Sequence, residues 1–217
     1  MNLKLSEQLS ELEIIKRIVE NDEKALYEII IRRFNPYLYK IGRSYNYNHE
    51  DTEDLMQDTY IDAYKNLSKF EGRSDFKTWI VRIMMNNCYR KREKLSFKNE
   101  IMQDVNDQSK PLFTSTSNTG KVVHNRELGN AIEHALSEIP YDYRITFSLR
   151  EINGFSVAET ADLLNISEAN VKVRLNRAKT MLKDKLAQSY SNKELYEFNL
   201  IYCDAIVNKV MKKINEL

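Results

Sequence analysis

The sequence predicts an all-α protein: two small helical domains joined by a flexible linker, followed by a helical tail. Apolar residues recur at spacings of three and four over most of the chain, as in amphipathic helices. Only 5 glycines and 3 prolines occur among 217 residues, although strands need tight turns that favour both. The helical periodicity stops near residue 97 and resumes near residue 125, which predicts a division into two domains.

The first domain is expected to span residues 1–97 and to contain four helices. The first helix should bury one face; the second should run from about Glu23 to Tyr45, with a kink or break at Pro36. The third should start at Asp51 or Thr52 and end near residue 66, and the fourth should cover about 76–94. The face expected to be buried on the first helix comprises Leu9, Leu12, Ile15, Ile18 and Val19.

The rest of the chain divides into three segments. Residues 98–125 include a stretch of Thr, Ser, Asn and Gly without apolar residues, which indicates a flexible linker. Residues 126–188 form the second helical domain, and residues 189–217 carry a helical pattern of their own. For this tail, a helix packed on one of the domains is the favoured interpretation, with Cys203 in the packing. A cover over the DNA-binding face and a partner-binding segment stay open.

Composition excludes several classes of protein. No apolar run approaches the roughly 20 residues that span a bilayer, so no membrane insertion is expected. The N-terminus lacks a secretory signal pattern, which predicts a cytoplasmic protein. Cys88 and Cys203 cannot form a disulfide scaffold or a four-ligand zinc site. The three histidines are scattered, and no phosphate loop or nucleophile motif occurs, so we expect neither a cofactor nor enzymatic activity.

The strongest local motif lies at residues 156–179. Ser156 and Glu159 form a capping box before a short helix, and Ser167 can cap a second helix after a tight turn. The second helix is apolar on one face and basic on the other. Two short helices arranged in this way describe a helix-turn-helix, whose second helix enters the DNA major groove. An ordinary helical hairpin with a solvated basic face is the alternative.

A second signal is an acidic stripe on one helical face, formed by Asp51, Asp54, Asp58 and Asp62. Leu55 and Tyr60 are expected elsewhere on the same surface. Carboxylates at this spacing repel one another and do not stabilise the helix. They can be simply solvated, bind a divalent metal or meet a basic protein partner; a metal site is disfavoured because no second cluster completes it.

A third signal follows at residues 70–92, where aromatic residues alternate with cations and a helix ends in a basic cluster. This combination suits single-stranded nucleic acid, because bases stack on rings while cations follow the backbone. The competing interpretation places the aromatic residues in the core. For Phe76, Trp79, Ile80 and Ile83 we expect burial rather than contact.

These three signals, in this order, resemble the extracytoplasmic-function (ECF) sigma factors of bacterial RNA polymerase, within the sigma-70 superfamily. The resemblance to their domain two covers about residues 25–94, with DTEDLMQDTYIDAY and KFEGRSDFKTWIVRIMMN. The resemblance to their domain four covers about 127–186, with ALSEIPYDYRITFSLREINGFSVAETADLLNISEANVKVRLNRAKTMLKDKL. The family has two helical domains on a flexible linker. It binds core polymerase, recognises the −10 and −35 promoter elements and starts transcription.

The resemblance implies a role for each part. The acidic helix would dock on the β′ clamp of core polymerase, and domain four would meet the β flap. The loop and helix after it would capture and melt the −10 element as single strands, and the helix-turn-helix would bind the −35 duplex. Whether an anti-sigma factor holds the protein stays open. The polymerase-binding residues would be Asp51, Asp54, Leu55, Gln57, Asp58 and Asp62.

The same resemblance supplies candidate DNA contacts. In the recognition helix, Lys172, Val173 and Asn176 would face bases, and Arg174 and Arg177 would contact phosphates or form supporting ion pairs. The −10 set is Lys69, Phe70, Gly72, Arg73, Ser74, Lys77, Arg82, Asn86, Asn87 and Arg90. The −35 set is Ser167, Asn170, Lys172, Val173, Arg174, Asn176 and Arg177.

Two positions depart from the family pattern. Arg90 stands where many relatives carry Asp, which adds charge to the basic end of its helix. Val173 replaces a small polar residue and can meet a thymine methyl but donates no hydrogen bond. A stand-alone helix-turn-helix regulator is the competing hypothesis. It would leave the acidic stripe and the Trp79 helix without a function.

Overall fold

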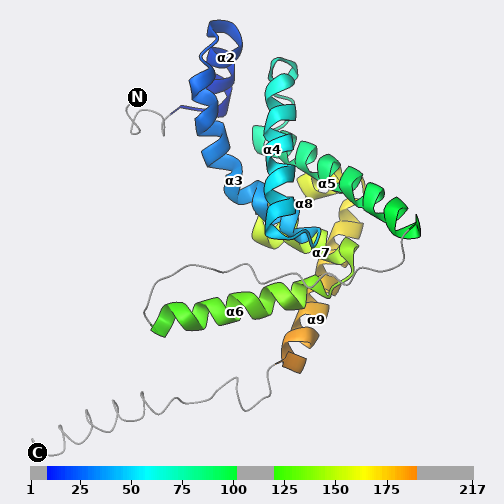
Figure 1. The fold of residues 1–217 in the computed structure, drawn as a ribbon. Helices are drawn as coiled ribbons and strands as arrows, with labels where there is room; N and C mark the ends of the chain where they lie inside the picture. Colours follow the sequence, from blue (N-terminus) through cyan, green and yellow to red (C-terminus); the bar gives the residue numbers. More distant parts are fainter. Residues whose placement is uncertain (1–8, 102–119, 190–217) are drawn as a thin grey trace, which may run out of the picture.

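The computed structural model describes residues 9–101 and 120–189, and every regular element within them is a helix (Figure 1). This confirms the predicted all-α class. The N-terminal half contains α2 to α5, and the C-terminal half contains α6 to α9. The bounds are α2 Glu11–Asn21, η1 Lys24–Leu26, α3 Tyr27–Ser44, α4 His49–Lys65, η2 Leu67–Lys69, α5 Phe76–Ile101, α6 Gly120–Ser137, α7 Tyr141–Phe147, η3 Ser148–Ile152, α8 Val157–Leu164 and α9 Glu168–Ser189.

Ser10 caps the start of α2 with a capping box, and Asp22 follows its last residue with a left-handed backbone (φ 55°) that turns the chain toward α3. Its buried stripe is Ile14, Ile15 and Ile18. The predicted face was wrong for Leu12 and Val19, which are 62% and 46% exposed. The reason is that α2 touches the rest of the protein along a narrow stripe, so residues at its flanks stay in solvent.

Helix α3 runs unbroken through Pro36, so the alternative of a break is wrong. The proline removes one backbone donor, but Ile30, Phe34, Leu38 and Ile41 bury a continuous stripe on both sides of it. Burial of that stripe outweighs the local loss of a hydrogen bond. The two ends of α3 therefore pack against the same core.

Helix α4 begins at His49, two or three residues before the predicted start at Asp51 or Thr52. Asn48 is the N-cap, because its side-chain oxygen accepts a 2.7 Å hydrogen bond from the backbone N–H of Asp51. The sequence prediction placed the start at Asp51 or Thr52 and did not consider Asn48. Helix α4 buries Thr52, Leu55, Thr59 and Ala63 against α3 and α5.

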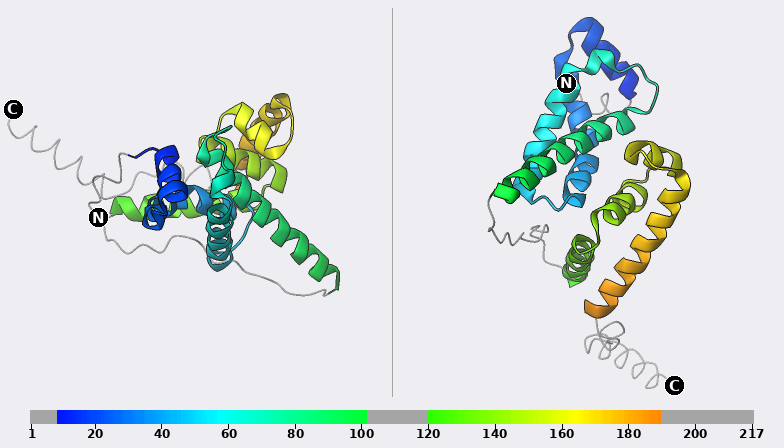
Figure 2. Two further views of the ribbon diagram at one scale, coloured as in Figure 1. Left: turned by 90° about the horizontal axis from the view of Figure 1, so that it is seen from above. Right: turned by 90° about the vertical axis from the view of Figure 1, so that its right-hand side faces the viewer.

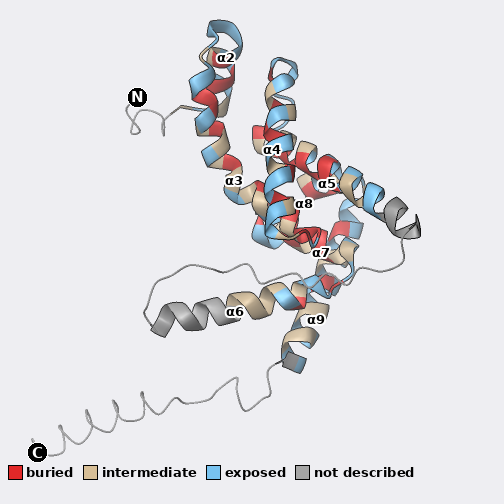
Figure 3. Ribbon diagram, viewed as in Figure 1, coloured by how far each residue is buried: buried red, intermediate tan, exposed pale blue. Residues whose placement is uncertain are grey.

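Helices α3, α4 and α5 come close together at Gly42 of α3. A Cβ placed there would lie 2.6 Å from Cγ2 of Thr52 and 3.0 Å from Cε of Met84. Helices α3, α4 and α5 therefore meet where α3 has no side chain. Figure 3 shows buried residues gathered along this crossing.

The C-terminal half contains the predicted helix-turn-helix. The Ser156–Glu159 capping box starts α8, and Asn165 follows its last residue in the left-handed conformation (φ 52°). The hydroxyl of Ser167 then accepts from the backbone N–H of Asn170 and caps α9. Helix α9 packs on α6, α7 and α8, with Val171 and Ala178 fully buried.

The two halves lie side by side, with α3 against α7 and η3 and α5 against α8 (Figure 2). Helix α5 extends to Ile101 and α6 starts at Gly120, so both enter the segment predicted as linker. The remaining linker prediction, for residues 102–119, lies outside the described residues. So do the predictions for the tail beyond residue 189, including Cys203.

Replacing Gly42 with alanine tests the helix crossing. Overpacking costs about 1–3 kcal/mol, and the better helix propensity of alanine offsets about 1 kcal/mol of it. We expect Gly42→Ala to lower the free energy of unfolding in urea. Adding Thr52→Ala should restore most of the loss, because it removes Cγ2 and a buried hydroxyl that has no partner. A double variant as unstable as the single one would contradict this packing.

Candidate nucleic-acid interface

The exposed face of α4 is acidic, and the carboxylates in the middle of the helix have no partner among the described residues. Asp54 and Asp58 are exposed, and neither makes a hydrogen bond or ion pair with another described residue. Gln57 lies between them and is also exposed. Ile61 continues the same face and is 51% exposed, which sequence reasoning missed because an apolar residue in a helix is first assigned to the core. This face is therefore open to a partner.

The ends of the predicted acidic stripe are engaged by α5. Asp51 forms an ion pair with Lys91, and Asp62 accepts a 3.2 Å hydrogen bond from the side-chain amide of Asn87. Both carboxylates are partly buried. The stripe thus separates into two outer residues that hold α4 on α5 and two inner residues that face solvent.

Leu55 and Tyr60 were predicted on the surface of the acidic helix, and both are buried. Leu55 is 5% exposed and belongs to the core. The Tyr60 hydroxyl donates to Ile31 or Asn35, at 3.1 and 2.9 Å from their oxygens, and burial raises the pKa of the phenol. Leu55 is therefore corrected from a docking residue to a core residue.

The loop between η2 and α5 is anchored by aromatic packing. The half-buried ring of Phe70 lies 5.2 Å from that of Phe76 and 5.3 Å from that of Trp79. Gly72 follows with φ +69°, a conformation that other residues adopt at a cost. Lys69, Arg73 and Ser74 are exposed on this loop. Phe76 and Ile80 are buried as predicted, whereas Trp79 and Ile83 are partly buried.

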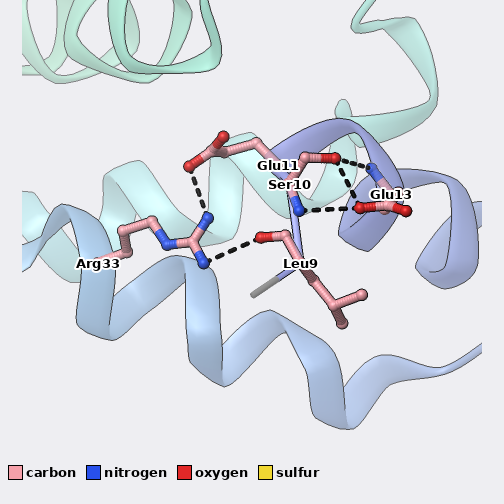
Figure 4. Close-up of polar contacts among 5 residues, drawn as sticks. All are labelled: Leu9, Ser10, Glu11, Glu13 and Arg33. Carbon is pink, nitrogen blue, oxygen red and sulfur yellow. Dashed lines mark hydrogen bonds and ion pairs between the residues drawn. The ribbon is translucent and has the colours of Figure 1, made fainter. Parts of the chain in front are cut away.

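Helix α2 supports this loop, because Leu12 lies next to Gly72 and α2 packs on η2. Figure 4 shows how its start is held: the guanidinium of Arg33 donates to the Glu11 carboxylate at 2.6 Å and to the Leu9 carbonyl at 3.1 Å. Beside it, Ser10 and Glu13 form the reciprocal capping bonds. These bonds lower the pKa of the Glu13 carboxyl.

The basic face of α5 carries Arg82, Asn86 and Arg90 at spacings of four, and all three are exposed. Asn87 is instead 8% exposed and donates to the Thr59 hydroxyl at 3.2 Å as well as to Asp62. Its side-chain oxygen accepts from Arg90 at 2.8 Å. Asn87 is thus corrected from a DNA contact to a residue that joins α4 and α5 and positions Arg90.

Two other predicted −10 contacts are engaged by the C-terminal half. The Lys77 ammonium lies between the rings of Tyr37 and Phe155, 4.3 and 4.4 Å from their centres, and donates to the carbonyl of Asn153. Burial lowers the pKa of this amine. Arg82 forms an ion pair with Asp162 of α8. Neither contact has a sequence signal, because it joins residues about eighty positions apart.

The recognition helix α9 presents its predicted contacts to solvent. Asn170, Lys172, Val173 and Asn176 are exposed, and Val173 is 49% exposed. Arg174 is within 3.5 Å of Asp142, and Arg177 donates to the Tyr143 hydroxyl at 3.2 Å. A cavity of about 560 Å³ separates these arginines from Arg92 at the basic end of α5. Ser167 serves as the cap.

Comparison with known proteins assigns both halves. Residues 30–97 match the family model for sigma-70 region 2, and residues 129–182 match the model for sigma-70 region 4. The two matches together span more than half of the chain. The chain belongs to the sigma-70 family. Within it, the resemblance to ECF sigma factors is confirmed. The matched segments fall inside the predicted domains, 1–97 and 126–188, whose exact boundaries stay predictions.

Relatives of this sigma factor include the ECF RNA polymerase sigma-E factors of Escherichia coli K12 and Haemophilus influenzae. The first is 27% identical over 189 residues, which cover 84% of this chain and 97% of the relative. The second is 24% identical over 191 residues, which cover 84% and 98%. Two similar solved structures show the same fold, and each is a complex with a second protein.

One of these structures is the sigma factor RpoE in complex with the anti-sigma factor NepR from Bartonella quintana. It has a TM-score of 0.62 and 24% identity, and the likeness covers 76% of this chain and 96% of that one. Another is CnrH in complex with the cytosolic domain of CnrY, with a TM-score of 0.59, 21% identity and coverage of 82% and 97%.

Two further observations bear on the sequence predictions. In the ranges 9–101 and 120–189, no three His, Cys, Asp or Glu side chains gather where they could hold a metal ion. Across the same ranges, no helix has both the length and the apolar character needed to cross a membrane.

Arg33→Ala tests whether α2 supports the loop between η2 and α5. It removes an ion pair whose side chains are 27% and 36% exposed and a bond to a backbone carbonyl. We expect the free energy of unfolding to fall by about 1 kcal/mol. Backbone amides of residues 70–75 should also exchange hydrogen faster. Arg32→Ala is the matched control, because its pair with Glu28 is 70% and 64% exposed. Equal effects of both variants would refute a specific support.

Proposed function

We propose that the protein is an alternative sigma factor of the ECF type, which binds core RNA polymerase, recognises the −10 and −35 elements and starts transcription. The observation that carries this proposal is the pairing, on one chain, of an open acidic face in region 2 with an exposed basic recognition helix in region 4. The sigma-E relatives support the same function.

For polymerase docking we propose the inner face of α4. Asp54, Gln57 and Asp58 lie exposed there, with Ile61 as the apolar member in place of the buried Leu55. A basic partner such as the β′ clamp would supply the opposite charge that these carboxylates lack within the chain. Asp51 and Asp62 would act mainly by fixing α4 on α5. The β flap is the proposed partner of the C-terminal half.

For the −10 element we propose two adjoining surfaces. The loop with Lys69, Phe70, Gly72, Arg73 and Ser74 would receive an unstacked base, because it combines an aromatic floor with exposed cations and hydroxyl groups. Helix α5 would bind the melted strand through its basic face. That face comprises Arg82, Asn86 and Arg90, and Lys77 at the start of α5 is proposed as a further contact.

For the −35 element we propose that α9 enters the major groove. Lys172, Val173 and Asn176 would face base edges, since they are exposed on the same side of the helix. Arg174 and Arg177 would neutralise phosphates, and Asn170 with the capped N-terminus at Ser167 would approach the backbone. Specific binding would need the polymerase, which holds both halves at a fixed separation on promoter DNA.

The proposed protein is a non-catalytic, cytoplasmic subunit, which binds polymerase and helps it to separate the DNA strands. An anti-sigma partner is part of the proposal, because two proteins of similar fold were solved in complex with NepR and with CnrY. A stand-alone regulator is not favoured, since duplex binding by α9 alone would leave the open acidic face of α4 without a partner.

Reversing the charges of α4 tests polymerase docking. We expect Asp54→Lys with Asp58→Lys to weaken binding to purified core polymerase at least about tenfold, because each lysine would meet a basic surface. The measurement is the dissociation constant by fluorescence anisotropy of the labelled protein. Glu20→Lys with Glu28→Lys makes the same change in charge on exposed parts of α2 and α3 and should bind as the wild type does. Unchanged binding by the α4 variant would exclude this surface.

Lys172→Ala tests the recognition helix. On promoters identified by mapping transcripts that depend on the protein, we expect initiation to fall about tenfold, since a base contact is worth about 1–3 kcal/mol. Lys183→Ala removes an exposed lysine farther along α9 and serves as the control. If both variants initiate equally well, residue 172 does not contact the promoter.

A further inference from the structure

A cavity of about 560 Å³ lies between α5 of the N-terminal half and helices α7 and α9 of the C-terminal half. The described residues that line it include three arginines, which are Arg92 of α5 and Arg174 and Arg177 of α9, and one aspartate, Asp142. Cavities of about 300–1,000 Å³ are typical of sites for small molecules. Because cations outnumber carboxylates in this lining, the ligand that it favours is an anion.

Arg92 is held in the wall of the cavity by aromatic rings. Its guanidinium carbon lies 4.2 Å from the centre of the Tyr141 ring and 5.1 Å from the centre of the Tyr89 ring. No carboxylate in the described ranges forms an ion pair with this arginine. The rings fix the guanidinium but supply no negative charge, so its N–H groups can donate to the oxygens of a phosphate.

The α9 side of the cavity presents two arginines whose partners are weak. The Nη1 atom of Arg174 lies 3.5 Å from Oδ1 of Asp142, which is longer than an ordinary N–H···O hydrogen bond. Arg177 donates at 3.2 Å to the hydroxyl of Tyr143, a neutral acceptor whose own proton can be donated to an anion. Guanidinium donors therefore approach the cavity from both α5 and α9.

The buried Arg144 adds to the positive charge beside the cavity. Burial lowers the pKa of its guanidinium, and the nearby charge of Arg92 acts in the same direction. Its hydrogen bonds go to backbone carbonyls, including those of Ser44 and Ile139 at 2.7 Å, and not to a carboxylate. An anion bound at Arg92 would therefore relieve repulsion between these two cations.

We propose that this cavity is a binding site for a small oligophosphate anion, either a free chain of phosphates or the phosphate chain of a nucleotide. Arg92, Arg174 and Arg177 would donate to its oxygens, because guanidinium groups match the geometry of phosphate. Duplex DNA does not enter a cavity of this volume, since its major groove alone is about 12 Å wide. A nucleotide would place its base beside Tyr143 or Val173, which also line the cavity.

The proposed site overlaps the −35 surface. Four of the proposed −35 contacts also line the cavity, namely Asn170, Val173, Arg174 and Arg177. A bound oligophosphate would therefore compete with the −35 duplex for part of α9. This consequence rests on the proposed function, whereas binding of the anion does not. Arg92 lies outside the proposed polymerase and DNA contacts, so it can be changed without altering either.

Calorimetric titration of the full-length protein tests the site directly. The probes are sodium tripolyphosphate, ATP and adenosine, each without magnesium and at one ionic strength. We expect tripolyphosphate and ATP to bind one site per chain with dissociation constants below about 100 μM, and adenosine to bind at least about tenfold more weakly. No saturable binding of either phosphate compound up to about 1 mM, or equal binding of adenosine, would overturn the proposal.

The same titration identifies the source of the phosphates. ATP bound at least about fivefold more tightly than tripolyphosphate would assign the ligand to the nucleotides, because the base would add contacts. Equal or weaker binding of ATP would assign the ligand to free chains of phosphate. Either result supports an oligophosphate site.

Arg92→Ala tests whether the cavity is the place of binding. Lys94→Ala removes the same charge from an exposed position on the same helix and is the matched control. We expect Arg92→Ala to bind tripolyphosphate at least about tenfold more weakly than Lys94→Ala, because it loses a charge-assisted hydrogen bond. Equal affinities of the two variants would overturn the assignment to this cavity.

Asp142→Asn tests the same site in the opposite direction. It removes the carboxylate that faces Arg174 and should tighten tripolyphosphate binding at least about threefold. Asp184→Asn makes the same change in charge at an exposed position of α9 outside the lining. Loss of folding cannot produce a gain in affinity. No gain over Asp184→Asn would therefore contradict binding between Arg92 and Arg174.

A fluorescent duplex tests the overlap with the −35 surface. Tripolyphosphate is added at about ten times its dissociation constant for Lys94→Ala, at constant ionic strength. We expect it to weaken duplex binding at least about fivefold for Lys94→Ala and about twofold or less for Arg92→Ala, by mass action. Equal losses in the two variants would contradict the overlap.

These outcomes are separate from failure of the proposed function. The calorimetry uses neither DNA nor polymerase, so it reports on the anion site alone. A protein that binds oligophosphates but starts no transcription would contradict the sigma function and leave the site intact. One that starts transcription but binds no oligophosphate would contradict the site and leave the sigma function intact.

Discussion

The structure depends on one constraint, which is how α4 is buried. One side of α4 packs into the core through Thr52, Leu55, Thr59 and Ala63. The close approach at Gly42 disfavours any rotation of α4 about its own axis. Asp54 and Asp58 consequently have to face solvent. Because Asp62 also holds Asn87, and through it Arg90, the same packing positions the basic face of α5.

Much of the fold could be predicted because its signals are local. The capping box at Ser156, the second cap at Ser167 and the glycine in the −10 loop each depend on residues a few positions apart. The orientation of each helix about its own axis was harder to predict. Leu55 and Leu12 are both leucines in helices, yet Leu55 is buried and Leu12 is exposed. Which residues of an amphipathic helix are buried depends on where the neighbouring helices lie and on how wide the contact with them is.

The candidate site was predictable in its parts and unpredictable in its connections. Exposed acids on α4 and cations on α5 and α9 follow from charge and periodicity. The burial of Asn87 and the contacts of Lys77 and Arg82 with the C-terminal half depend on pairs distant in the chain. Arg144 gives the same lesson, since a buried arginine that caps the end of α3 looks like a surface residue in the sequence.

The most direct test of the account is run-off transcription with purified core polymerase of the source organism on fragments of its genome. The account predicts discrete transcripts that require the full-length protein and share conserved elements near −10 and −35 at their start sites. Absence of such transcripts, with a protein that is folded and core polymerase that is active with another sigma factor, would contradict the sigma function.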